Sequence, residues 1–413
     1  MDDNNRNVPK LRFPGFTDAW EQRKFDEWGT FYYGHSCPKW SVTEDATTPC
    51  IRYGELYTKF GAKIDKVYSY TNMPPEKLRF STGKEVLIPR VGEDPWDYNH
   101  CTWLSLKDVA IGEMISVFNT DQDPLFSATM FNATLQKEFA VRVEGGSVTN
   151  LYFEKLKNID VSYPSLPEQK KIAAFFENID NLITLHQRKL DSIKNIKKCM
   201  LQKMFPKEGE QFPEVRFPGF TDAWEQRKLG EMSSSFEYGL NAAAKEYDGT
   251  NKYIRITDID DNSREFLQED VTSPDTDLSK AEGYKLSEGD ILFARTGASV
   301  GKSYIYKASD GLVYYAGFLI RAKIKPEYNP EFIFQNTLTS DYEKFIKVTS
   351  MRSGQPGVNA QEYSQFEINV PSKPEQDKIA TYFRNIDNLI TLHQRKYGEL
   401  KELKRYLLQN MFP

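Results

Sequence analysis

An internal duplication is the feature that most constrains this chain. The segment RFPGFTDAWEQRK begins at Arg12 and recurs without change at Arg216, 204 positions later. A second pair of similar segments begins at Pro164 and Pro371, and both copies then end in Met-Phe-Pro. A repeat determines the architecture of a chain and has to be recognised first. The chain therefore consists of two tandem copies, at about residues 8–206 and 212–413.

The stretches between the repeated segments are about 140 residues long in each copy and nearly unalike. Only short anchors correspond: Ile51-Arg52 resembles Ile254-Arg255, and the segment at residues 87–92 resembles the one at 292–297. The repeated segments form a frame that is nearly the same in both copies, whereas the inserts between them differ. This indicates that the frame and the inserts have different functions. We expect the inserts to share a fold and to differ in their surfaces.

A long helix is predicted after each Pro-Glu-Gln, because apolar residues recur there at heptad spacing. The seam positions are Ile172, Phe176, Ile179, Ile183, Leu190, Ile193, Met200 and Met204 in the first copy, and Ile379, Phe383, Ile386, Ile390, Tyr397, Leu400, Leu407 and Met411 in the second. His186, Lys197, His393 and Lys404 are polar seam positions, and we interpret the histidines as structural. A helix of about 38 residues is roughly 55 Å long and suits a spacer. We expect the two helices to form an antiparallel coiled coil with an approximate two-fold axis.

The inserts contain short runs of β-branched and aromatic residues, such as 252–256 and 290–294, which predict strands. A helix is expected at residues 330–347. The predicted fold class is α+β, with two mixed α/β domains separated by the long helices. The expected division is a repeated segment at 1–24, a first domain at 25–163, a first spacer at 164–206, a linker with the second repeated segment at 207–228, a second domain at 229–370 and a second spacer at 371–413.

A glycine-rich loop at residues 294–303 follows an apolar strand in the second domain. Its glycines Gly297 and Gly301 enclose three residues, whereas a P-loop needs four, so nucleotide binding is not favoured. Exposed amides, hydroxyls and an arginine suit contact with a DNA backbone and with guanine. The alternative is a tight turn with a solvated lysine. The candidate DNA contacts in this loop are Arg295, Thr296, Gly297, Ser299 and Lys302.

A second loop at residues 350–359 carries amide side chains that can pair with adenine, although the same residues are ordinary turn formers. Its candidate contacts are Arg352, Gln355 and Asn359. The first domain lacks a clear copy of either loop, and only Arg90 corresponds to Arg295. The remaining candidates are the anchor arginines Arg52 and Arg255.

Composition and motif spacing exclude several classes of function. The net charge of −5 argues against indiscriminate nucleic-acid binding. No apolar run is long enough for a membrane helix and no secretory start is visible, so we expect a cytoplasmic protein. The four cysteines have no paired spacing and indicate free thiols, and no metal site is expected. We find no G-x-G turn for a methyl donor and no paired carboxylates for DNA cleavage, so no catalytic residue is expected.

The order of a variable domain, a long helix after P-x-x-P-E-Q, and the same again resembles the specificity subunit of type I restriction-modification systems. The specific matches are RFPGFTDAWEQRK, NIDNLITLHQRK and the loops at 294–302 and 354–359. The resemblance implies two target-recognition domains that read a bipartite, asymmetric sequence in double-stranded DNA. It also implies docking of two methylation subunits and two restriction subunits, with S-adenosylmethionine, ATP and Mg held by those partners and no cofactor in this chain.

Two other classes of function are weighed against this one. An adaptor whose repeats bind proteins and never meet DNA is supported mainly by the acidic net charge. An independent methyltransferase or nuclease would require turnover by the purified chain alone.

Overall fold

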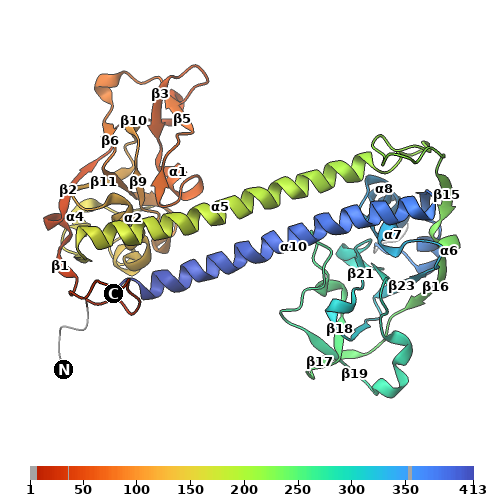
Figure 1. Ribbon diagram of the computed structural model, residues 1–413. Helices are drawn as coiled ribbons and strands as arrows, with labels where there is room; N and C mark the ends of the chain where they lie inside the picture. Colours follow the sequence, from red (N-terminus) through yellow and green to blue (C-terminus); the bar gives the residue numbers. More distant parts are fainter. Residues whose placement is uncertain (1–6, 36, 352–355) are drawn as a thin grey trace. The chain divides into compact units, whose positions relative to one another are not determined.

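The chain forms two compact units in the computed structural model, which describes residues 7–35, 37–351 and 356–413. Unit 1 comprises Met1–Gln187 and Arg395–Pro413, and unit 2 comprises Arg188–Gln394. Each of the two long helices, α5 (Leu166–Lys203) and α10 (Lys373–Asn410), contributes one end to each unit (Figure 1). The compact units therefore differ from the two copies that follow each other in the sequence.

The two long helices confirm the prediction from the heptad pattern. Each has 38 residues, and Pro167 and Pro374 lie in their first turns, where proline costs no hydrogen bond. Seam residues of both helices are buried in the hydrophobic clusters of the units, among them Ile172, Phe176, Ile379 and Phe383. Within the described residues, no helix is long and apolar enough to cross a membrane.

Unit 1 contains a larger sheet of order β2-β11-β7-β9-β4 and a smaller one of order β5-β3-β10-β6. The larger sheet is built from β2 (Gly29–Tyr33), β4 (Lys63–Ile64), β7 (Glu85–Pro89), β9 (Thr102–Leu104) and β11 (Ile115–Thr120). The smaller is built from β3 (Thr48–Ile51), β5 (Ser69–Thr71), β6 (Phe80–Thr82) and β10 (Lys107–Ile111). The remaining strands are β1 (Glu21–Lys24), β8 (Val91–Gly92), β12 (Glu144–Gly145), β13 (Thr149–Asn150) and β14 (Asp160–Tyr163).

Unit 2 contains two four-stranded sheets, of order β16-β23-β20-β21 and β17-β19-β18-β22. The first is built from β16 (Ser233–Tyr238), β20 (Ile291–Ala294), β21 (Ser303–Ile305) and β23 (Leu319–Ile324). The second is built from β17 (Ala243–Glu246), β18 (Lys252–Ile254), β19 (Thr272–Asp275) and β22 (Val313–Tyr315). A separate pair is formed by β15 (Glu225–Lys228) and β24 (Glu367–Val370).

The two domains share a strand-pairing scheme although their sequences are nearly unalike. In unit 1, β11 lies antiparallel between β2 and β7, and in unit 2 β23 lies antiparallel between β16 and β20. Parallel pairing also corresponds, between β3 and β10 in unit 1 and between β18 and β22 in unit 2. This agreement supports the expectation of a shared fold.

Short helices complete both domains. They are α1 (Tyr53–Thr58), α2 (Pro124–Thr134), α3 (Gln136–Ala140) and α4 (Phe153–Leu156) in unit 1, and α6 (Leu229–Met232), α7 (Pro330–Asn336), α8 (Ser340–Ser350) and α9 (Ala360–Ser364) in unit 2. The single helix predicted at 330–347 is thus two helices. Thr337 ends the first one, and Thr339 is the N-cap of the next.

In each copy, an ion pair connects the repeated segment to the Pro-Glu-Gln start of the long helix. Arg12 donates two hydrogen bonds to Glu168, at 2.7 and 2.8 Å, and Arg216 makes the same two bonds to Glu375. Both carboxylate side chains are only 1% exposed. A buried carboxylate needs a paired, hydrogen-bonded partner. The repeat therefore preserves an ion pair between distant parts of each copy.

The Met-Phe-Pro end of each copy packs into the unit that holds the domain of the other copy. In unit 1, Phe412 lies against Trp20 and Phe176, with ring centroids 6.0 and 5.8 Å apart. In unit 2, Phe205 lies against Trp224 and Phe383, at 6.3 and 5.8 Å. This exchange is the physical reason that the compact units differ from the tandem copies.

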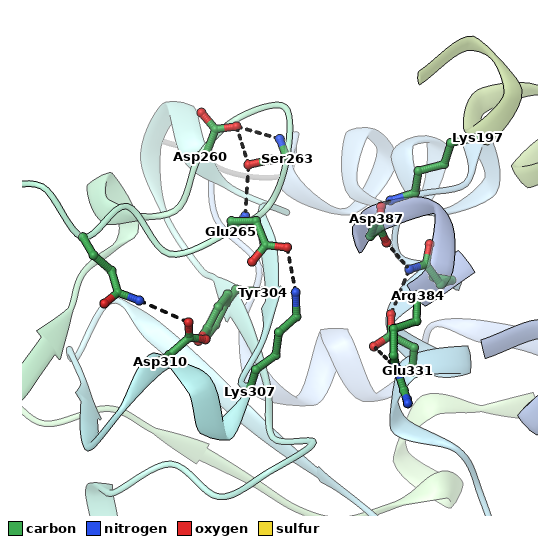
Figure 2. A network of polar contacts seen from close by, with 12 residues as sticks. Lys197, Asp260, Ser263, Glu265, Tyr304, Lys307, Asp310, Glu331, Arg384 and Asp387 are labelled. Carbon is green, nitrogen blue, oxygen red and sulfur yellow. Dashed lines mark hydrogen bonds and ion pairs between the residues drawn. The ribbon is translucent and has the colours of Figure 1, made fainter. Parts of the chain in front are cut away.

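Polar contacts between the two long helices also occur inside each unit. Lys404 of α10 forms an ion pair with Asp180 of α5 in unit 1, and Lys197 of α5 bonds Asp387 of α10 at 2.6 Å in unit 2. The unit 2 pair continues into the domain, because Gln335 of α7 donates to Asp387 and to Glu331. Figure 2 shows Lys197, Asp387 and Glu331 in this network. Glu331 is 8% exposed, and burial raises its pKa.

Candidate nucleic-acid interface

The two loops predicted to contact DNA in the second domain meet in the structure. Thr296 and Gly357 form an antiparallel β-bridge, and the amide of Gly297 donates to the carbonyl of Pro356 at 3.1 Å. The amide of Val358 donates to the carbonyl of Arg295 at 2.9 Å. The glycine-rich loop and the end of the second loop therefore form one surface feature around Arg295.

Two buried tyrosines hold the glycine-rich loop from below. The Tyr363 hydroxyl donates to the carbonyl of Ala294 at 2.7 Å and accepts from the amide of Gly301 at 3.2 Å. The Tyr342 hydroxyl donates to the carbonyl of Gly301 at 2.9 Å. Because the Gly301 amide is used inside the protein, it is not presented to a ligand as a P-loop amide would be.

The guanidinium of Arg295 is stacked on two exposed aromatic rings. Its guanidinium carbon lies 5.1 Å from the Tyr238 ring centroid and 5.9 Å from that of Phe318. Its Nε is buried without a hydrogen-bond partner. No described residue accepts a hydrogen bond from its two terminal nitrogens. A stacked guanidinium keeps a fixed orientation, so these nitrogens form a pre-oriented donor pair.

Arg90 also lies beside two aromatic rings in the first domain, and only one of them, Tyr33, corresponds to a ring beside Arg295. Its guanidinium carbon lies 4.6 Å from the Tyr33 ring centroid and 5.5 Å from that of Tyr152, and its Nε is likewise buried without a partner. One terminal nitrogen donates to the carbonyl of Glu113 at 3.3 Å. The Tyr33 hydroxyl donates to Glu154 at 2.6 Å, and burial together with this hydrogen bond raises the pKa of Tyr33.

The backbone around the two arginines corresponds as well, although the first domain has no clear sequence copy of either loop. Leu151 donates to the carbonyl of Arg90 at 2.8 Å, as Val358 does to Arg295. Strand β13 pairs with β8 directly after Arg90, where unit 2 has its bridge between the two loops. Backbone hydrogen bonds require few particular side chains at these positions, so this pairing could not be predicted from the sequence.

Sequence reasoning missed the tyrosines beside the two arginines. Each precedes a glycine, in Tyr33-Gly34 and Tyr238-Gly239, and the two pairs are separated by 205 positions, as are Arg90 and Arg295. A Cβ on Gly34 would lie 2.0 Å from a backbone oxygen, and one on Gly239 would lie 2.1 Å from another. The recurring Tyr-Gly pair was the available signal, and its glycine is required by close backbone packing.

The anchor arginines Arg52 and Arg255 both begin a helical turn after the parallel strand. The Arg255 side chain makes two hydrogen bonds to Asp258, at 2.9 and 2.8 Å, and its backbone amide bonds the same carboxylate. The backbone amide of Arg52 bonds Glu55 at 2.9 Å. The correspondence of these anchors is thus a shared local structure, and Arg255 is held by its acidic neighbour.

Lys302 and Asn359 have their polar atoms engaged within the protein. Lys302 is 7% exposed, and its ammonium donates to the carbonyl of Ile259 and to Asp261 at 2.9 and 2.6 Å. It is therefore neither a free phosphate contact nor a solvated turn residue. The Asn359 side chain caps α9 by accepting from the amide of Glu362 at 2.9 Å. We leave both residues out of the proposed contact set.

The structure assigns no specific DNA contact to the remaining predicted DNA-binding residues. Thr296, Gly297 and Ser299 are half-buried in the loop. Arg352 and Gln355 lie outside the described residues. Among the residues that are described, no three His, Cys, Asp or Glu side chains converge as metal ligands.

Comparison with known proteins relates this chain to one family. A family model described as "Type I restriction modification DNA specificity domain" matches residues 107–195 and 221–402. The chain is similar to the type I restriction enzyme MjaVIII specificity subunit of Methanocaldococcus jannaschii, at 22% identity over 65% of this chain and 64% of the relative. It is also similar to the putative MjaX specificity subunit of that organism, at 24% identity over 62% and 58%. The chain thus spans less than two thirds of the length of these relatives.

A solved structure shares the fold. It is the S subunit of a type I restriction-modification system from M. genitalium, with a TM-score of 0.62 and 16% sequence identity. The match covers 98% of this chain and 99% of that one.

Proposed function

Because the chain belongs to the family of type I restriction modification DNA specificity domains, we propose that it is the DNA-recognition component of a type I restriction-modification system. In this role it reads one asymmetric, interrupted sequence in double-stranded DNA, and each domain reads one half. The chain itself performs no catalysis.

The observation that carries this proposal is the stacked arginine of each domain. Arg90 and Arg295 occupy corresponding positions in two domains whose sequences otherwise diverge. Arginine donors held at a fixed angle suit bidentate pairing with guanine O6 and N7. The residues around the two arginines differ, so the two domains recognise different half-sites.

The long helices act as the spacer between the two readers, as an antiparallel coiled coil with an approximate two-fold axis. Two observations made within the units support this. Lys404 pairs with Asp180 in unit 1 and Lys197 with Asp387 in unit 2, and these are the same two positions with the copies exchanged. An antiparallel pair of like helices makes this reciprocal contact.

Exposed leucines on the long helices are the proposed docking surface for two methylation subunits. Leu182 and Leu185 are each 45% exposed, and their counterparts Leu389 and Leu392 are 46% and 40% exposed. The two leucines of each pair are three residues apart on one helix and so lie side by side, and contiguous exposed apolar side chains mark interaction surfaces. The methylation subunits hold S-adenosylmethionine, and two restriction subunits use ATP and Mg. Leu182→Asp combined with Leu389→Asp should abolish co-purification of the methylation subunit and leave the chain folded; unchanged co-purification refutes this surface.

Methylome sequencing of cells that carry this chain and its methylation partner tests the proposal. The expected result is one bipartite motif with unlike halves, and a palindromic or continuous motif contradicts it. Gel shifts over a series of salt concentrations separate this role from a protein-binding adaptor. DNA recognition predicts binding that weakens steeply with salt, whereas an adaptor binds no DNA at any salt.

A further inference from the structure

In each domain, the backbone carbonyl of an apolar residue accepts a hydrogen bond from the amide of the stacked arginine. In unit 2, the backbone amide of Arg295 donates to the carbonyl of Phe318 at 3.1 Å. In unit 1, the amide of Arg90 donates to the carbonyl of Met114 at 3.3 Å. Both residues immediately precede a strand, β23 or β11, that pairs with the strand ending one residue before the arginine, β20 or β7. Phe318 and Met114 therefore occupy corresponding positions.

Phe318 is not needed for the core of its domain. Its side chain is 57% exposed, while its neighbours Ala316 and Leu319 are buried. Among the described residues, it belongs to none of the hydrophobic clusters of unit 2. A phenylalanine left in water loses the gain that burial would bring. Its position beside a donor pair indicates that it is covered when a partner binds there.

The chemistry next to a bound guanine limits what can cover this ring. An arginine that binds guanine O6 and N7 lies in the major groove, where thymine presents its C5-methyl group and phenylalanine is a known apolar contact for it. Neighbouring bases on a strand are about 3.4 Å apart along the helix axis. The ring centroid lies 5.9 Å from the guanidinium carbon, so a ring bound beside the arginine reaches the adjacent base.

We infer that Phe318 contacts the C5-methyl group of a thymine adjacent to the guanine bound by Arg295, and that Met114 makes the corresponding contact beside Arg90. The inference rests on the proposed function and deepens it, because it assigns a base to the position next to each arginine. Each half-site then contains a thymine next to a guanine, on either strand.

The test uses the full chain with its methylation partner and duplexes of the motif found by methylome sequencing. Each such thymine is replaced by uracil, which removes only the methyl group. We expect the replacement to weaken wild-type binding about fourfold in each half-site, as for one buried methyl group. Phe318→Ala should bind the thymine and uracil duplexes equally in one half-site only, and Met114→Ala should do so in the other. Phe212→Ala, which truncates another half-exposed phenylalanine, is the matched control and should keep the discrimination in both halves.

The possible results distinguish a failure of the proposed function from a failure of the thymine inference. Wild-type protein that binds no duplex at low salt overturns the proposed function. Wild-type binding without discrimination between thymine and uracil, or a Phe318→Ala variant that retains it, overturns the inference alone. A half-site motif without a thymine next to a guanine also overturns it.

Discussion

At the scale of single residues, the two stacked arginines carry the argument for DNA recognition. Arginine lies flat on an aromatic ring and directs two parallel donors outward, and lysine can do neither. We expect Arg295→Lys to weaken binding to the cognate duplex at least tenfold, through loss of contacts in one half-site, and to leave subunit assembly unchanged. Competition between duplexes altered in one half or the other measures this.

The matched variant Arg90→Lys should produce the same loss in the other half-site. If either variant weakens both halves equally, the arginines are not assigned one to each reader. If Arg295→Lys prevents assembly with the methylation subunit, its role is structural.

A buried carboxylate in unit 2 gives a prediction about pH. Burial raises the pKa of Glu331. At pH values between the ordinary and the raised pKa, this side chain is therefore protonated in the folded chain and ionised in the unfolded chain. Stability therefore falls as the pH rises through the window between the ordinary and the raised pKa. Glu331→Gln keeps the hydrogen bond from Gln335 and removes this dependence. We expect the variant to be more stable than the wild type at pH 7, and this difference to shrink as the pH falls towards the ordinary pKa of a glutamate.

Thermal unfolding at several pH values measures the effect, with Glu343→Gln on the exposed face of α8 as the control. A variant whose stability relative to the wild type does not change with pH would show that folding does not shift the pKa of Glu331.

Sequence reasoning located Arg90 and Arg295 because they lie at matching offsets in matching apolar strands. It did not find what surrounds them. Tyr33 and Tyr238 come from other strands, β2 and β16, and their nearness to the arginines depends on sheet pairing through β11 and β23. Lys302 was predicted to contact DNA, with a solvated turn lysine as the alternative, but it is buried because Ile259 and Asp261, some forty positions earlier, supply acceptors. Contacts at such separations leave no local pattern.

At the scale of elements, the repeated segment serves to hold the start of each long helix. Arg12→Ala leaves the carboxylate of Glu168 buried without a partner, which costs about 3–5 kcal/mol. The exposed ion pair of Lys24 with Asp160 provides the control, since Lys24→Ala should cost less than about 1 kcal/mol. Chemical denaturation compares the two variants, and similar losses for both would show that the Arg12 pair is not a structural tie.

The elements themselves were predictable to different degrees. The long helices were predicted throughout, because burial along one seam imposes a seven-residue period on 38 residues. The run at 330–347 kept its apolar residues in helical order, yet the chain caps and restarts the helix at Thr337 and Thr339. A break of this kind is set by packing on both sides and not by the local pattern.

At the scale of the whole molecule, the exchange of chain ends makes the order of the two copies dispensable. The amide of Leu11 bonds the carbonyl of Asn410 at 2.8 Å, as that of Val215 bonds Lys203 at 2.8 Å. Joining Pro413 to Asn7 through a copy of residues 207–210, and opening the chain within 207–211, should therefore preserve both units. We expect the permuted chain to unfold within a few degrees of the original and to recognise the same DNA motif. A permuted chain that fails to fold, or that reads a different motif, contradicts this.

The same exchange has a consequence for how the protein is made. The core of unit 1 includes Phe412, which is synthesised after every residue of unit 2. As the chain leaves the ribosome, unit 2 can bury its whole hydrophobic cluster before Phe412 has been synthesised. Trp20 and Phe176 of unit 1 lack their contact with Phe412 until then. Unit 1, which emerges first, is thus completed last. During elongation we expect chaperones to bind its exposed aromatic surface.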